Sequence, residues 1–254
     1  MKLTPALVAV LLATPAVAQD KPPLRTRVAL GPQLVPSYPG ADRVSLRPLI
    51  DLSRARGDAT FAFEAPDESF GFPLVRDARL QVGPSLNFEG SRTARDVGAA
   101  VPKVGFTVEV GGFAQYQLTP AVRLRADARK GLGGHRGLVG SVGADYVWRD
   151  ADRWLWSLGP RVTLNDDRYA RAYFGVTPGT AATTGLPAFR ASGGVQAIGL
   201  TGGAIRQLTR HWGVYGYAKY DRLVADPARS PLVRRFGSRD QLSGGLALSY
   251  TFGG

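Results

Sequence analysis

Apolar and polar residues alternate along much of the chain, in segments of roughly ten residues. This pattern constrains the fold more than any other feature, because successive side chains of a β-strand point to opposite faces. In residues 121–130 (AVRLRADARK), four apolar side chains fall on one face and four ionisable side chains fall on the other. A transmembrane barrel accommodates such strands, since lipid covers the apolar face and a wet lumen meets the polar face.

The alternation predicts eleven strands of about the length that a tilted membrane-spanning strand requires. They cover residues 26–35, 44–52, 59–71, 75–87, 104–117, 121–131, 138–149, 153–164, 194–207, 212–224 and 241–252. An even number is expected when both chain ends lie on one side of the membrane. We therefore expect twelve strands, with a hidden turn at Glu64–Glu68 (EAPDE), and ten strands as the alternative.

A soluble, lipocalin-like barrel would use the same period, with its apolar face inside and its charges outside. Two features favour the membrane barrel. The polar face of the last strand consists of small Gly, Ser and Thr residues that suit a lumen, and Tyr250-Thr251-Phe252 matches the insertion signal of outer-membrane barrels. The sequence therefore predicts an all-β fold, a transmembrane antiparallel β-barrel of the outer membrane.

The first residues indicate export. Lys2, the apolar run Leu7–Ala13 and the small residues Ala16–Ala18 together form a signal-peptide pattern, which predicts a cleaved leader at 1–18 and a barrel domain at 19–254. The net charge of +12 comes from basic residues spread along the whole chain. Export and this even spread argue against nucleic acid as a partner.

Connector lengths distinguish two ends of the barrel. Tight polar turns are expected at 118–120, 149–153 and 208–211, and longer segments at 87–103, 131–137, 165–193 and 225–240. Short periplasmic turns and long external loops are usual in such barrels. The four Trp residues lie beside the short turns, as in an interfacial belt (Trp148, Trp154, Trp156, Trp212). Four Arg residues in 225–240 suit the phosphates of lipopolysaccharide, so we expect contact with outer-membrane lipid and lipopolysaccharide.

Catalytic and cofactor motifs are missing from the sequence. It contains no G-x-S-x-G elbow, H-E-x-x-H, Walker A or G-x-G-x-x-G run, and no Cys. His135, with Ser141 six residues later, could act as a surface general base, but a His among glycines is more often a turn residue. We therefore expect a protein that is not an enzyme and that binds no cofactor or metal.

The inward-facing charges form the main candidate site. By alternation, six basic residues face the lumen together with four acidic residues. They are Arg79, Arg123, Arg125, Arg129, Arg161 and Lys219, with Glu109, Asp127, Asp145 and Asp221. A mixed set this dense favours an ion-paired interior over an open pore. A channel for small solutes is the alternative.

The order of several short motifs resembles the MipA/OmpV family of outer-membrane proteins. The segments are Pro36–Asp42 (PSYPGAD), Leu80–Leu86 (LQVGPSL), Lys130–Gly137 (KGLGGHRG), Tyr173–Val176 (YFGV) and Leu223–Val233 (LVADPARSPLV). Family positions within these motifs are Tyr38, Gly40, Asp42, Gly133, His135, Gly137, Ser230 and Pro231. Their residue types are typical of turns.

This resemblance implies a function that the residues alone do not. Proteins of the family are described as scaffolds for the machinery that synthesises murein. The resemblance therefore implies two periplasmic partners, a lytic transglycosylase and a bifunctional penicillin-binding protein. They would dock on the periplasmic rim, where the short turns and residues 19–27 lie.

Overall fold

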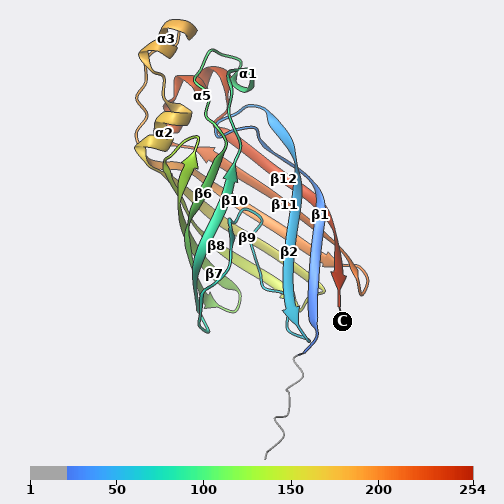
Figure 1. The fold of residues 1–254 in the computed structure, drawn as a ribbon. Coiled ribbons are helices and arrows are strands. Elements are labelled where there is room, and N and C mark those ends of the chain that lie inside the picture. Colours follow the sequence, from blue (N-terminus) through green and yellow to red (C-terminus); the bar gives the residue numbers. More distant parts are fainter. Residues whose placement is uncertain (1–21, 254) are drawn as a thin grey trace, which may run out of the picture.

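The computed structural model describes residues 22–253, which form one antiparallel sheet curled into a barrel (Figure 1). Ten strands are 10 to 14 residues long. They are β1 (Leu24–Pro36), β2 (Val44–Arg56), β5 (Leu80–Glu89), β6 (Thr107–Thr119), β7 (Val122–Gly133), β8 (Leu138–Asp150), β9 (Trp154–Asn165), β10 (Gly194–Gln207), β11 (Trp212–Leu223) and β12 (Asp240–Phe252). Two short strands, β3 (Phe70–Gly71) and β4 (Val75–Arg76), complete the expected twelve.

The strand β1 pairs with β2, each long strand from β5 to β12 pairs with the next in the chain, and β12 pairs with β1. The hairpin of β1 and β2 stays in register from Leu24 opposite Arg56 to Pro36 opposite Val44. Short connections at 120–121, 151–153 and 208–211 lie at the same end as the C-terminus, and we call this the turn end (Figure 1). The helices lie at the opposite end, the helix end (Figure 1).

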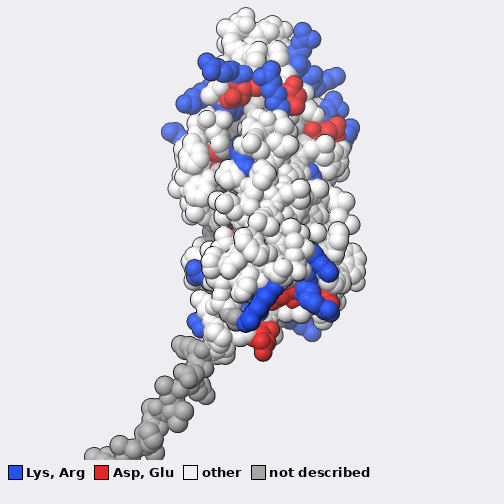
Figure 2. All heavy atoms as spheres, turned by 90° about the vertical axis from the view of Figure 1, so that its right-hand side faces the viewer, with Lys and Arg blue, Asp and Glu red and all other residues white. Residues whose placement is uncertain are grey.

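Burial follows the predicted alternation. On β12, Leu242, Leu246 and Leu248 are exposed on the outer face, whereas Gln241 and Ser249 are buried inside. Figure 2 shows the result on one side of the molecule: Lys, Arg, Asp and Glu gather at the two ends, and the band between them consists mostly of other residues. Such a band is what the hydrocarbon region of a membrane requires.

The long connections fold into five short helices at the helix end. These are α1 (Ala94–Val97), α2 (Asp167–Phe174), α3 (Pro178–Thr184), α4 (Ala225–Arg229) and α5 (Pro231–Phe236). They share an apolar cluster, the cap cluster, in which Tyr173 and Phe174 of α2 pack with Leu232 and Val233 of α5. Burial of such side chains contributes about 1.5–3 kcal/mol each, so the cap cluster gives these short helices the stability that they lack alone.

Residues 59–71 do not form the spanning strand expected from the sequence. Residues 57–69, which we call the inserted segment, leave β2 at the turn end and enter the lumen, and only Phe70 and Gly71 join the sheet. The turn expected at Glu64–Glu68 is confirmed, because the Glu68 N–H donates to the Ala65 carbonyl at 3.1 Å. The chain then returns along β5 as β3 and β4, so the strand expected at 75–87 is divided.

This return leaves a seam in the wall. Residues 70–76 cover β5 at residues 81–86, but they cover neither the remaining residues 87–89 nor β2. Residues 70–76 run antiparallel to β5. Because neighbouring strands alternate in direction around the sheet, β2 also runs opposite to β5. Residues 70–76 are therefore parallel to β2 and cannot continue the antiparallel pairing. Pro48, inside β2, lacks an N–H group, as is typical of an edge strand.

The expected leader at residues 1–18 lies outside the described residues. Among residues 22–253, no helix is long and apolar enough to cross a membrane.

Replacing Leu246 by Arg tests the position of the apolar band. Leu246 lies near the middle of β12 and is 72% exposed on the outer face. We expect the Leu246→Arg variant to lose about 2–4 kcal/mol of folding free energy in lipid vesicles. Leu208→Arg is the matched control, because Leu208 is 59% exposed in a turn, where the cost falls to about 0–1 kcal/mol. Equal losses in urea titrations of the two variants would contradict a bilayer around β12.

Candidate functional site: the charged interior of the barrel

The inner face of the wall carries the predicted charges on β6 to β9 and on β11. Nine of the ten predicted residues are buried or half-buried, and Arg79 is exposed at the turn end. The nine are Glu109 on β6, Arg123, Arg125, Asp127 and Arg129 on β7, Asp145 on β8, Arg161 on β9, and Lys219 and Asp221 on β11. Their alternation with outward apolar residues brings them into one lumen.

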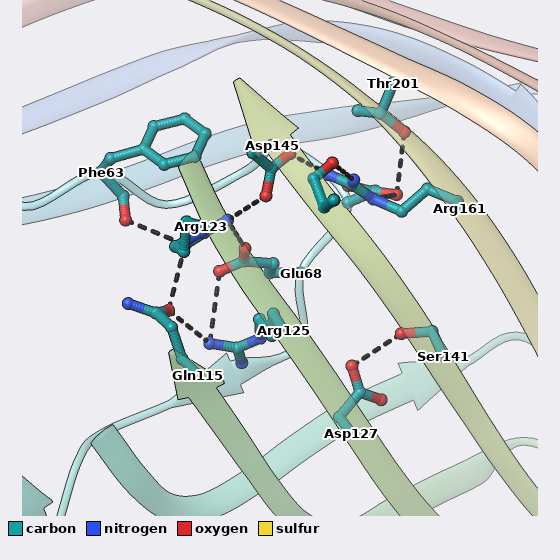
Figure 3. Close-up of polar contacts among 12 residues, drawn as sticks. Phe63, Glu68, Gln115, Arg123, Arg125, Asp127, Ser141, Asp145, Arg161 and Thr201 are labelled. Atoms are coloured by element: carbon teal, nitrogen blue, oxygen red, sulfur yellow. Dashed lines mark hydrogen bonds and ion pairs between the residues drawn. The ribbon is translucent and has the colours of Figure 1, made fainter. Parts of the chain in front are cut away.

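Asp145 bridges two arginines at the centre of this set (Figure 3). Its carboxylate accepts from Arg123 Nη2 and from Arg161 Nη2, both at 2.6 Å. Arg123 is 1% exposed and Asp145 is 2% exposed. Charges this deeply buried are stable only when their hydrogen-bonding capacity is met by partners, and here each arginine still needs a second carboxylate.

The inserted segment supplies those carboxylates. Asp67 accepts from Arg161 Nε at 3.0 Å and from the Thr201 hydroxyl at 2.9 Å, and it lies 3.3 Å from Lys219 Nζ. These partners come from β9, β10 and β11, so Asp67 joins three strands of the wall.

Glu68 links the inserted segment to β7. It forms an ion pair with Arg123, and its other oxygen lies 3.4 Å from Arg125 Nη1. Arg123 also donates to the Phe63 carbonyl at 3.2 Å and lies 4.4 Å from the centre of the Phe63 ring (Figure 3). The segment is therefore fixed by its backbone, by a ring and by two carboxylates.

Asp67 belongs to the inserted segment and not to a membrane-spanning strand. Burial alone would raise the pKa of its carboxyl group, but the charges of Lys219 and Arg161 lower that pKa to about 2. Asp67 is therefore ionised at neutral pH, and the network keeps its charge–charge attraction there.

A second cluster lies nearer the helix end. Glu109 accepts from Asn87 Nδ2 and Arg129 Nε, both at 3.0 Å, and lies 3.1 Å from His135 Nε2. Asp127 pairs with Arg129 and accepts from the Ser141 hydroxyl at 2.8 Å. The cluster therefore adds side-chain links from β5 to β8 to the backbone pairing of these strands.

His135 is buried in this cluster and does not lie on the surface. Its Nδ1 atom accepts from the Gly137 N–H at 3.1 Å, so the neutral ring donates from Nε2 to Glu109. The ring packs edge-on against Tyr169, with centroids 4.8 Å apart, and a Cβ at Gly131 would meet it at 2.3 Å. Both ring nitrogens are occupied, so the geometry offers no free general base and leaves Ser141 bound to Asp127.

The other family positions surround the cap cluster. Tyr38 is buried there, and Gly40 has φ +94°, a conformation that favours glycine. Gln241 holds this turn by accepting from the Gly40 N–H at 3.0 Å and donating to the Ala41 carbonyl at 2.9 Å. The buried Ser230 hydroxyl donates to the Phe174 carbonyl at 2.7 Å.

The remaining family positions lie in or beside turns. Asp42 is exposed, and Pro231 is the first residue of α5. Gly133 has φ +103°, and Gly137, four residues later, is buried.

A polar cavity of about 430 Å³ lies between the inserted segment and the cap cluster. The turn at Pro66–Glu68 forms its floor, and Tyr38 and Tyr169 lie on its cap side. Arg47, Glu89 and Gln33 complete much of its wall.

Asp67, Glu68 and Phe63 belong to the charged interior, and the alternation did not identify them. The signal was present in EAPDE, where three acidic residues surround a proline opposite a wall rich in arginine. Among residues 22–253, no group of three or more His, Asp or Glu side chains is placed to hold a metal ion.

Comparison with known protein families gives one match. The family model described as MltA-interacting protein MipA matches residues 28–252. No curated protein sequence matches the chain.

Similar solved structures include three outer-membrane proteins. The CymD monoaromatic hydrocarbon channel is 12% identical, with TM-score 0.39, over 92% of this chain and 89% of that chain. The channel DcaP of Acinetobacter baumannii is 10% identical, with TM-score 0.37, over 91% and 96%. The Escherichia coli outer membrane protease OmpT is 12% identical, with TM-score 0.29, over 94% and 99%.

Neutralising Asp67 tests the central network. Asp67→Asn leaves Arg161 and Lys219 without a shared carboxylate, so we expect a loss of about 3–5 kcal/mol in the free energy of unfolding. Asp150→Asn is the control, because Asp150 pairs with an Arg153 side chain that is 76% exposed, and surface pairs are worth about 0–1 kcal/mol. Urea unfolding in vesicles, followed by tryptophan fluorescence, measures both losses.

The same comparison has a defined pH dependence. Since folding lowers the pKa of Asp67 from 3.8 to about 2, the stability from its charge is present above 3.8 and is lost as pH falls through about 2. The difference between the wild type and Asp67→Asn should therefore shrink over that range. A difference that grows toward pH 2 would show that Asp67 does not act through its charge.

Proposed function

Because the chain belongs to the MltA-interacting protein MipA family, we propose that this outer-membrane β-barrel is a non-enzymatic scaffold for murein assembly. Its turn end faces the periplasm and binds a lytic transglycosylase, and a bifunctional penicillin-binding protein is the second partner. The observation that carries the proposal is the filled lumen, in which the inserted segment is tied to the wall by ion pairs. A rigid, filled barrel suits a platform better than a conduit.

The turn end offers a mixed, mostly basic rim. Arg79 and Arg153 are exposed there, and Arg25 pairs with Asp152 at 3.0 Å. The short turns provide little area, and a standard interface needs about 800 Å² on each partner. We therefore infer a modest interface in which charge steers association.

At the helix end, we propose contact with lipopolysaccharide. Arg234, Arg235 and Arg239 belong to the exposed basic residues around α5, and Figure 2 shows Lys and Arg gathered at this end. Guanidinium groups bind phosphates with strong, charge-assisted hydrogen bonds.

The second candidate function is a channel for small solutes, which the 430 Å³ cavity favours. The inserted segment would have to leave the lumen for such a channel to conduct. In planar bilayers we expect no steady current from the wild type, and brief openings from an Asp67→Asn, Glu68→Gln double variant that loosens the segment. A steady wild-type current would support the channel and contradict the filled-lumen scaffold.

Reversing charge on the rim tests the scaffold. We expect an Arg79→Glu, Arg153→Glu variant to capture a lytic transglycosylase about tenfold less well than the wild type, which corresponds to about 1.4 kcal/mol. The control is Arg234→Glu, Arg235→Glu, which makes the same change at the helix end. Capture after brief crosslinking in membranes, compared with an unrelated barrel, measures the effect. Equal capture by both variants would exclude this rim as the docking surface, and no capture by the wild type would contradict the scaffold itself.

A further inference from the structure

The cavity borders the seam in the barrel wall, where Arg47 of β2 and Asn87–Glu89 of β5 line it. Phe88 belongs to the lipid-facing set and is 48% exposed, yet it also lines the cavity. The other lining residues nearby, Asn87 and Glu89, follow the part of β5 that residues 70–76 cover. The edge of β2 opposite them has no paired strand within the described part of the chain. A route therefore leads from the polar cavity to the lipid-facing surface without crossing a hydrogen-bonded ladder.

An arginine and a glutamate stand at this point. Arg47 of β2 donates only to the Ser37 carbonyl, at 3.4 Å, and its Nη2 atom would lie 3.1 Å from a Cβ on Gly90. Glu89 of β5 lies on the other side of the seam. Within residues 22–253, neither side chain has an ion-pair partner within 4.0 Å, in contrast to Arg129, Arg161 and Lys219 deeper in the lumen.

The surroundings of these charges suit an amphipathic molecule. A polar group inside the cavity would meet a guanidinium on one side and a carboxylate on the other. An attached acyl chain would leave through the seam over Phe88, which stacks on Phe106 with ring centroids 6.2 Å apart. The volume of about 430 Å³ falls in the range of about 300–1,000 Å³ typical of small-molecule sites.

We propose that the seam and cavity form a lateral binding site for a single-chain phospholipid with a zwitterionic phosphoethanolamine head group. Arg47 binds the phosphate, and Glu89 binds the primary ammonium group. The acyl chain stays in the bilayer against Phe88 and Phe106. This site is independent of the rim at the turn end, so it does not depend on the scaffold function.

Competition between two lysolipids tests the charge pattern. The purified full-length protein in detergent is mixed with equal amounts of lysophosphatidylethanolamine and lysophosphatidylglycerol, which differ in the ammonium group, and bound lipid is counted by native mass spectrometry. We expect the wild type to retain the ethanolamine lipid preferentially. Arg47→Gln should weaken retention of both lipids about tenfold or more, because a charge-assisted hydrogen bond is worth about 1.5–3 kcal/mol. Glu89→Gln should remove the preference and leave the glycerol lipid bound.

The matched control is an Arg43→Gln, Asp42→Asn variant, which neutralises two exposed charges in the adjacent turn and should bind like the wild type. Heat-modified mobility on gels verifies that each variant is folded. Should a variant fail to fold, the wild type is compared with glycerophosphoethanolamine, which has the head group without the chain. Equal retention of the two lysolipids by the wild type would overturn the assignment. Undiminished binding by Arg47→Gln, or binding of the chain-free head group as tight as that of the lipid, would also overturn it.

Discussion

The pairing of Asp145 with both Arg123 and Arg161 is the interaction on which the interior depends. Three charges of β7, β8 and β9 meet in a space from which water is largely displaced, and the two arginines leave that group one positive charge in excess. Removing an ion from water costs several kcal/mol unless partners replace its hydration. Where the inserted segment displaces water, it therefore has to supply partners for these charges. Asp67 and Glu68 of the inserted segment supply carboxylates to these arginines and also pair with Lys219 and Arg125. The charges of the wall therefore determine where the segment lies.

Strand direction explains a second feature. Ten long strands could close as an antiparallel barrel through pairing of β2 with β5, because those two run in opposite directions. Where the chain leaves the lumen, residues 70–76 pair with the edge of β5 in place of β2. These residues run parallel to β2. The barrel thus fills its interior at the expense of one ladder. The place where that ladder is missing is also the place where the cavity approaches lipid.

Much of this architecture could be predicted from period-two alternation, because a spanning strand must separate lipid-facing from lumen-facing residues at every step. Residues 212–224 and 241–252 match β11 and β12 closely for this reason. The alternation alone did not distinguish the inserted segment from a strand, since Phe61, Phe63 and Ala65 alternate just as a strand would. The rings of Phe61 and Phe63 lie against Arg27 and Arg123 inside the barrel and do not face lipid. Which side chains pair across the lumen depends on how the barrel closes, and no local sequence pattern encodes that. The contacts of His135 with Glu109 and Tyr169 could not be predicted for the same reason.

The separation in sequence between Asp67 and its partners sets an order of events during assembly. Asp67 bonds to Thr201, 134 residues later, and closing so long a loop is slow. Once β1 pairs with β12, only the turn end and the seam give access to the lumen. Residues 67 and 68 precede in the chain all the basic residues of β7, β9 and β11 with which they pair, so these ion pairs require the later strands to have joined the wall. A wall that closed without the segment inside would leave Arg123 and Arg161 without the carboxylates of Asp67 and Glu68.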